Sequence, residues 1–85
     1  MNKGNSMIEA GIEDSDMVII QNCNSAQNRD IVAVSIGEEA TLKRFMRLGG
    51  DVLLVPEKPN YETIHIKDDQ ARIIGVAIGI LKKKA

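Results

Sequence analysis

Short apolar runs, several of them bounded by glycine, proline, asparagine or aspartate, constrain this chain more than any other feature. Six of them predict strands, at residues 17–21, 31–36, 40–46, 51–55, 63–66 and 72–81. Many of their residues are isoleucine or valine, whose branching at Cβ favours strands. A helical period is not sustained anywhere, and only residues 7–11 are expected to form a single helical turn. Six closely spaced strands without a long helix predict an all-β barrel or folded sheet.

Glycines mark the expected turns and irregularities of this sheet. Gly37, followed by two glutamates, predicts a tight hairpin between the second and third strands. Gly49 and Gly50 lead into the fourth strand. Gly75 and Gly79 lie inside the last strand, where glycine is typical of bends or bulges.

Length and composition limit the chain to one small domain. Eighty-five residues make a single domain, and a chain of this size buries roughly 60–65% of its unfolded surface. Phe45 and Tyr61 are the aromatic residues, so the core must be aliphatic. A net charge of −1 gives no indication of nucleic-acid binding by this chain. Cys23 is the single cysteine, which excludes an internal disulfide and fits a reducing, cytoplasmic location.

Other classes of site find little support in the sequence. The longest apolar run, residues 73–81, is well short of the roughly 20 residues of a membrane span, so no membrane partner is expected. Asp14 and Asp16 are spaced as turn formers, and no His/Cys cluster offers a metal site. We therefore predict no metal and no cofactor. Lysines 82–84 are interpreted as a solvated tail.

Ser6, at the head of an apolar run, raises the question of nucleophilic chemistry. A serine nucleophile needs a base that takes its proton and donors that hold the oxyanion. His65 is the obvious base by residue type. It alternates with Ile64 and Ile66, however, so if these isoleucines point inward His65 points to solvent.

Lys43 is the alternative base. A lysine serves as a base only when it is uncharged, which requires burial that lowers its pKa. Alternation places Lys43 on the same strand face as Thr41 and Phe45, within an apolar run. The residues alone leave two interpretations open, an exposed strand lysine or a buried base.

Four blocks of sequence occur in a recognisable order: GNSM with GIEDSDMVI, DIVAV with EATLKRF, LVPEKP, and IGVAIGIL. They resemble motifs of the LexA-like self-cleaving repressors and the related UmuD proteins. Those motifs are G-x-S-M with G-I-x-D-G-D-x-V-I, G-[DE]-I-V-V-A with E-x-T-V-K-R, L-x-P-E-N-P, and G-x-V-x-G-V-x-R. The resemblance extends from residue 4 to about residue 82 and implies a LexA- or signal-peptidase-like folded sheet or partial barrel.

The resemblance also implies a mechanism and partners. Ser6 is matched to the family's nucleophile and Lys43 to its neutral general base, and the backbone N–H groups of Ser6 and Asn5 are expected to hold the oxyanion. The bond cut is an Ala-Gly or Cys-Gly bond in the protein's own chain. The expected partners are a RecA filament on single-stranded DNA, which stimulates cleavage, and a second copy that pairs near residues 74–81.

Residues 1–85 are accordingly expected to form a single C-terminal catalytic and dimerisation domain of an SOS-response transcriptional repressor. The family's cleavage loop and helix-turn-helix domain are expected to be absent from this piece, so operator DNA would be bound only through the missing N-terminal domain. A UmuD-like accessory subunit of a lesion-bypass polymerase and a phage-type repressor are the alternatives.

Three of the departures from the family motifs affect turns or the strand that carries the lysine. Ser15 and Arg29 stand where the family has turn glycines, and we expect altered or slightly strained turns there. Leu42 replaces the valine before the lysine, which is a mild change.

Overall fold

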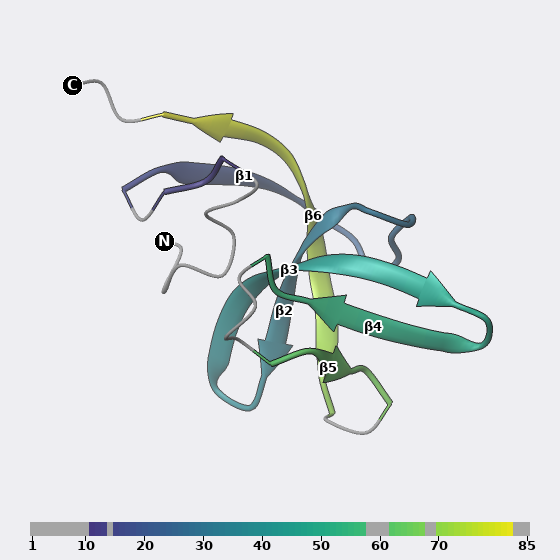
Figure 1. Cartoon of the computed structure of the whole chain (residues 1–85). Helices are drawn as coiled ribbons and strands as arrows, with labels where there is room; N and C mark the ends of the chain where they lie inside the picture. The colour runs from purple at the N-terminus through teal and green to yellow at the C-terminus, as the bar shows by residue number, and fades with distance from the viewer. Residues whose placement is uncertain (1–10, 14, 58–61, 68–69, 83–85) are drawn as a thin grey trace.

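The fold is a single antiparallel sheet, described here from a computed structural model for residues 11–13, 15–57, 62–67 and 70–82. Its strands are β1 (Met17–Asn22), β2 (Ile31–Ile36), β3 (Glu39–Leu48), β4 (Asp51–Val55), β5 (Ile64–His65) and β6 (Arg72–Leu81). They are hydrogen-bonded in the order β1-β6-β2-β3-β4-β5 (Figure 1). The predicted all-β fold is confirmed. Within the described ranges, no helix is long and apolar enough to cross a membrane.

Strand positions agree with the sequence pattern, with small differences in length. β1 is one residue longer than predicted and ends at Asn22. β3 extends beyond the predicted run at both ends because its ladder continues through polar residues, from Glu39 opposite Ile36 to Leu48 opposite Asp51. Backbone hydrogen bonds need no apolar side chain, so the apolar pattern underestimates the strand. β5 is shorter than predicted, with two residues opposite β4.

Two tight hairpins join β2, β3 and β4, at the glycines that predict them. Gly37 follows the last residue of β2 and has a φ of 59°. Gly49 begins the two-residue connection between β3 and β4, with a φ of 61°. This left-handed backbone carries little cost for glycine, which has no Cβ to clash.

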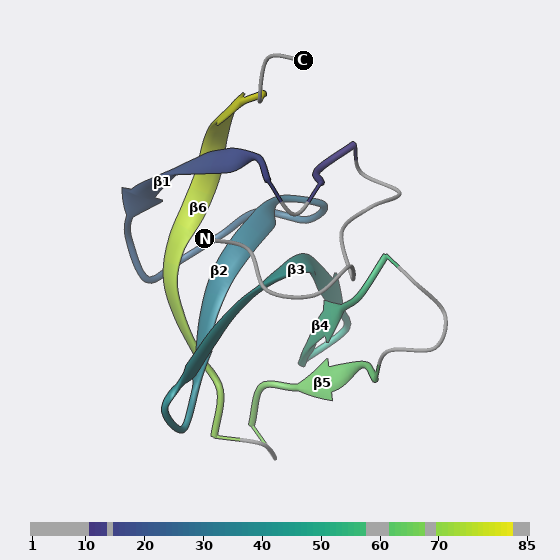
Figure 2. The same cartoon turned by 90° about the vertical axis from the view of Figure 1, so that its left-hand side faces the viewer.

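β6 is shared between two parts of the sheet. Its first half pairs with β2 and its second half with β1. Both ladders contain a register shift, where Ile74 and Ile78 are the extra residues directly before Gly75 and Gly79. The predicted bulges are therefore confirmed. Because bulges bend and twist a strand, β6 carries β1 away from the plane of the lower strands (Figure 2).

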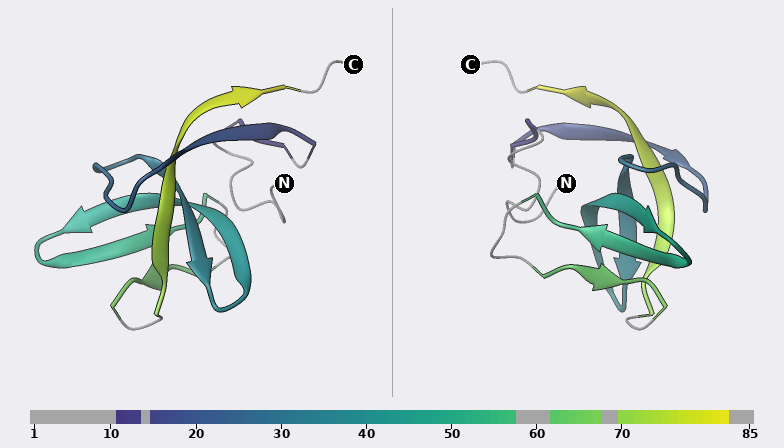
Figure 3. Two further views of the ribbon diagram at one scale, coloured as in Figure 1. Left: turned by 180° about the vertical axis from the view of Figure 1, so that it is seen from behind. Right: turned by 45° about the vertical axis from the view of Figure 1, so that its right-hand side comes forward.

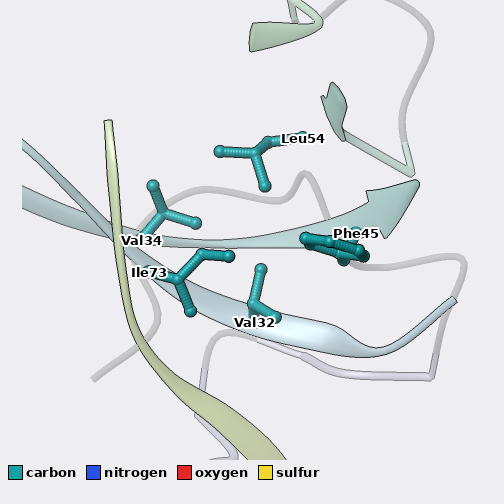
Figure 4. Close-up of a cluster of buried hydrophobic side chains, with 5 residues drawn as sticks. All are labelled: Val32, Val34, Phe45, Leu54 and Ile73. Atoms are coloured by element: carbon teal, nitrogen blue, oxygen red, sulfur yellow. The ribbon is translucent and has the colours of Figure 1, made fainter. Parts of the chain in front are cut away.

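The sheet buries side chains on both of its faces. One cluster consists of Val32, Val34, Phe45, Leu54 and Ile73 (Figure 4). The other consists of Ile12, Ala33 and Leu42. Consecutive β2 residues thus enter opposite clusters, as the two-residue period of a strand requires. Views from behind and turned by 45° show β2 to β5 curving together, with β1 and the end of β6 above them (Figure 3).

Candidate functional site

The predicted nucleophile lies outside the part of the chain that the structure describes. Residues 1–10 contain Ser6, Asn5 and most of the expected helical turn at residues 7–11, and all of these remain predictions. The site is therefore built from the predicted base, Lys43, and from the turn at Gly11 to Asp16 that follows the Ser6 segment.

Lys43 is held inside the sheet by its strand neighbours. It lies in β3 directly opposite Val32 of β2, and directly opposite residues share a face of the sheet. That face carries Phe45 and the first cluster. Lys43 is 6% exposed, so the interpretation as an exposed strand lysine is wrong. The predicted face, shared with Phe45, is confirmed.

Burial changes the acid–base behaviour of Lys43. Removal of the ammonium from water disfavours its charged form, and this desolvation lowers the pKa of Lys43 below its usual value of 10.5. A lowered pKa increases the fraction of uncharged amine near neutral pH, and only that form can accept a proton. Lys43 therefore has the environment that a lysine base requires.

His65 does not share this environment. It lies in the two-residue strand β5 at the sheet's edge and is exposed. Ile64 and Ile66, on either side of it, pack against the first cluster. The alternation in the sequence correctly predicts this arrangement.

The motif that contains Lys43 contacts the third motif of the sequence. Arg44 pairs with Glu57 across a distance of 2.5 Å between Nε and Oε1, and Arg44 also donates from its guanidinium to the carbonyl oxygen of Arg29 at 2.9 Å. Sequence reasoning missed this pair. Opposite charges 13 positions apart are too common to indicate a contact unless strand register is known.

The turn before β2 shows the predicted strain at Arg29, whose φ is 76°. Its N–H donates to the Phe45 carbonyl at 2.8 Å, and the Phe45 N–H donates to the Asp30 carbonyl at 2.8 Å. The Asn28 side chain accepts the Arg47 N–H at 2.5 Å. These bonds to β3 hold Arg29 in a conformation that favours glycine. Ser15 adjoins residue 14, which lies outside the described ranges, so its predicted effect stays a prediction.

The Gly11–Asp16 turn is held by a buried carboxylate. The Asp16 side chain is 1% exposed and lies 2.7 Å from Nζ of Lys82. It also accepts the Glu13 N–H at 2.9 Å, while the Asp16 N–H donates to the Glu13 carbonyl at 3.0 Å. The turn-forming interpretation of Asp16 is confirmed. The Lys82 side chain is 56% exposed, as the solvated-tail interpretation expects, but its ammonium also pairs with Asp16, which the sequence did not predict. Lysines 83 and 84 lie outside the described residues.

An apolar groove of about 370 Å³ lies beside this turn. Its lining comes from the turn, β1, β2 and β3: Ser15, Asp16, Met17, Val18, Ile20, Ala33, Ala40, Thr41 and Leu42. Ala33 and Leu42 belong to the second cluster, on the sheet face opposite Lys43. Among the described residues, no group of three or more His, Cys, Asp or Glu side chains could hold a metal ion.

Comparison with known proteins agrees with the motifs. The family model described as Peptidase S24-like matches residues 2–78. A LexA repressor of Clostridium perfringens is 48% identical over 79 residues, which cover 93% of this chain and 38% of the relative. A LexA repressor of Caldicellulosiruptor saccharolyticus is 43% identical over 81 residues, covering 95% of this chain and 39% of the relative. The chain thus spans less than two-fifths of these relatives, and it belongs to the Peptidase S24-like family.

Proposed function

We propose that this chain is the C-terminal catalytic and dimerisation domain of a LexA-like repressor, a serine peptidase that cuts its own protein. Ser6 is the nucleophile and Lys43 is the general base. The observation that carries the proposal is the burial of Lys43, which lowers its pKa. Lysine is usually charged and exposed, and keeping it buried is a cost that a base function explains.

The chemistry follows from an uncharged Lys43. Its amine accepts the proton of the Ser6 hydroxyl as the oxygen attacks a peptide carbonyl. Backbone N–H groups of Ser6 and Asn5 stabilise the negative oxygen of the tetrahedral intermediate. Lys43 then returns the proton to the leaving amine, and the C–N bond breaks to give an ester of Ser6. Water, deprotonated by Lys43, hydrolyses that ester and restores the free hydroxyl.

The substrate and partners belong to the longer protein. LexA repressors that match this chain are more than twice its length. We place the DNA-binding domain and the Ala-Gly or Cys-Gly bond that is cut in the part of such a protein that precedes this domain. A RecA filament on single-stranded DNA would favour the conformation in which that bond reaches Ser6, and cleavage would then release the operator.

Exposed apolar side chains on β1 and β6 support the dimerisation role. Met17 is 66% exposed, Ile78 62% and Leu81 56%. Met17 lies opposite Leu81 at the end of the β1–β6 ladder, and Ile78 is the extra residue of the bulge in that ladder. Ile78 and Leu81 belong to the part of β6 where the resemblance implies contact with a second copy. Sedimentation of Ile78→Glu should show a loss of dimer. Leu48→Glu is the matched control, because Leu48 is 57% exposed in β3, and it should leave the dimer intact. Equal sedimentation of the two variants would contradict this interface.

The catalytic proposal is tested by labelling the chain with a serine-reactive fluorophosphonate. Intact mass should show one label, placed on Ser6 by peptide mapping. The rate should rise with pH from neutral to alkaline as Lys43 loses its proton. Ser6→Ala and Lys43→Ala should each abolish labelling without loss of folding, measured by circular dichroism.

His65→Ala is the control for the choice of base. Because His65 is exposed, its removal should leave the labelling rate unchanged. A labelling rate that survives Lys43→Ala, or one that falls in His65→Ala, would show that the assignment of the base is wrong. A folded chain that takes no label at Ser6 would contradict the peptidase function of this domain.

A further inference from the structure

We propose that Lys82 is a positioning residue for the peptidase reaction: it fastens the Gly11–Asp16 turn, and through it the segment that carries Ser6, to the end of β6. The inference rests on the proposed function for the role of Ser6. The fastening itself is independent of that function, because it is a set of contacts between described residues.

The ladder between β1 and β6 brings the Asp16 carboxylate and the Lys82 ammonium together. Met17 is opposite Leu81 at the end of this ladder. The next residues outward are Asp16 and Lys82, which continue the pairing with an ion pair of 2.7 Å. Lys82 Nζ also donates to the Gly11 carbonyl oxygen. One ammonium group therefore contacts both ends of the turn.

Charge and burial make this contact strong enough to hold a turn. The Asp16 side chain is 1% exposed, whereas that of Lys82 is 56% exposed. A buried carboxylate is costly unless it is hydrogen-bonded and paired. Here the Glu13 N–H supplies one bond and the Lys82 ammonium supplies the opposite charge. Removing the ammonium takes an ion-pair partner away from a buried carboxylate, and opening of the turn would lower that cost by letting water reach Asp16.

The turn is close to Ser6 along the chain. Five residue steps separate Ser6 from Gly11, a contour of at most roughly 18 Å. Added motion of the backbone at Gly11 is therefore expected to displace Ser6, because only five residue steps connect them. A displacement of about 1 Å at reacting groups can cost on the order of 100-fold in rate. The ion pair between Asp16 and Lys82 consequently influences the alignment of Ser6 with Lys43.

The test uses the whole chain with Lys82→Met and Lys82→Arg. Lys67→Met is the matched control, since Lys67 forms an ion pair with Asp51 at 3.9 Å, and the side chains of that pair are 70% and 64% exposed. The first readout is hydrogen exchange at the amides of Glu13 and Asp16. In Lys82→Met it should speed up by roughly 10- to 100-fold, the loss expected for a bond to a charged group. Lys82→Arg should largely restore protection, and Lys67→Met should not change it.

The second readout is the rate of fluorophosphonate labelling at Ser6 as a function of pH. Lys82→Met should lower the rate by about 10- to 100-fold without moving the midpoint of the pH profile, and Lys82→Arg should recover most of it. Unchanged exchange in Lys82→Met would overturn the fastening. Faster exchange with an unchanged labelling rate would overturn the positioning role. A wild-type chain that takes no label would instead refute the peptidase proposal, and faster exchange would still confirm the fastening.

Discussion

Replacing Gly75 with alanine should make the domain easier to unfold, because β1 lies so close to Gly75 of its neighbour β6 that there is no room for a side chain. A Cβ at this position would lie 2.2 Å from Cγ2 of Ile20 and 2.7 Å from the carbonyl oxygen of Gln21. The Ile20 methyl group can move by side-chain rotation. The Gln21 oxygen belongs to the backbone of β1, so the strand itself must retreat.

The size of the effect follows from these distances. Ordinary contact begins at 3.4 Å, so the methyl group of Ile20 has to move by roughly 1.2 Å, and such overpacking typically costs about 1–3 kcal/mol. In a domain of this size each kcal/mol corresponds to roughly 4–8 °C in melting temperature. Gly75→Ala should therefore melt well below the wild type, with the loss concentrated in the β1–β6 ladder.

Gly79→Ala is the matched control, with the same substitution four positions along the same strand. The nearest atom to its Cβ would be Cδ1 of Ile19 at 3.4 Å, which is ordinary contact. This variant should be as stable as the wild type, or more stable by up to about 1 kcal/mol because alanine restricts the unfolded chain. Urea unfolding followed by circular dichroism measures both. If the free energies of unfolding of the two variants differ by less than about 0.5 kcal/mol, the close approach of β1 to Gly75 is refuted.

Substitutions at two further positions test the electrostatics and the backbone strain. The lowered pKa of Lys43 means that the unfolded chain binds one more proton between that pKa and 10.5, so wild-type stability should rise with pH across this window by up to about 1.4 kcal/mol per pH unit. Lys43→Met should lack this increment in urea unfolding at a series of pH values, and parallel curves would contradict the shift. Arg29→Gly should stabilise by up to about 1 kcal/mol by relieving the positive φ, while Arg29→Val should destabilise by about 1–2 kcal/mol. Both variants remove the guanidinium, so equal melting temperatures would exclude a backbone effect.

The positions of the strands along the chain were largely predictable because their causes are local. β-branched runs favour extended backbone, and glycines supply the turns at Gly37 and Gly49. Alternation along β3 also predicts that Lys43 shares a face with Phe45, since successive side chains of any strand point to opposite faces. The extension of β3 was missed because its ends pair through backbone atoms.

The electrostatic features of the site were not predictable in the same way. The burial of Lys43 depends on which strands cover its face, and the pairing of Arg44 with Glu57 depends on where the chain returns after β4. Without the family resemblance, the residues alone favoured an exposed strand lysine over a buried base. The resemblance selected Lys43, and the structure shows that this lysine is buried and that burial lowers its pKa.

The sequence by itself determined that this chain forms β-strands, where its turns lie, and which residues alternate together on a strand face. Those properties follow from backbone preference and from a two-residue period, both of which act over a few residues. Only the tertiary structure decided that β6 is shared between β1 and β2, that Lys43 is buried, and that Lys82 meets Asp16. The last two groups are 66 positions apart, and their contact requires a strand register that long-range packing sets and no local pattern encodes.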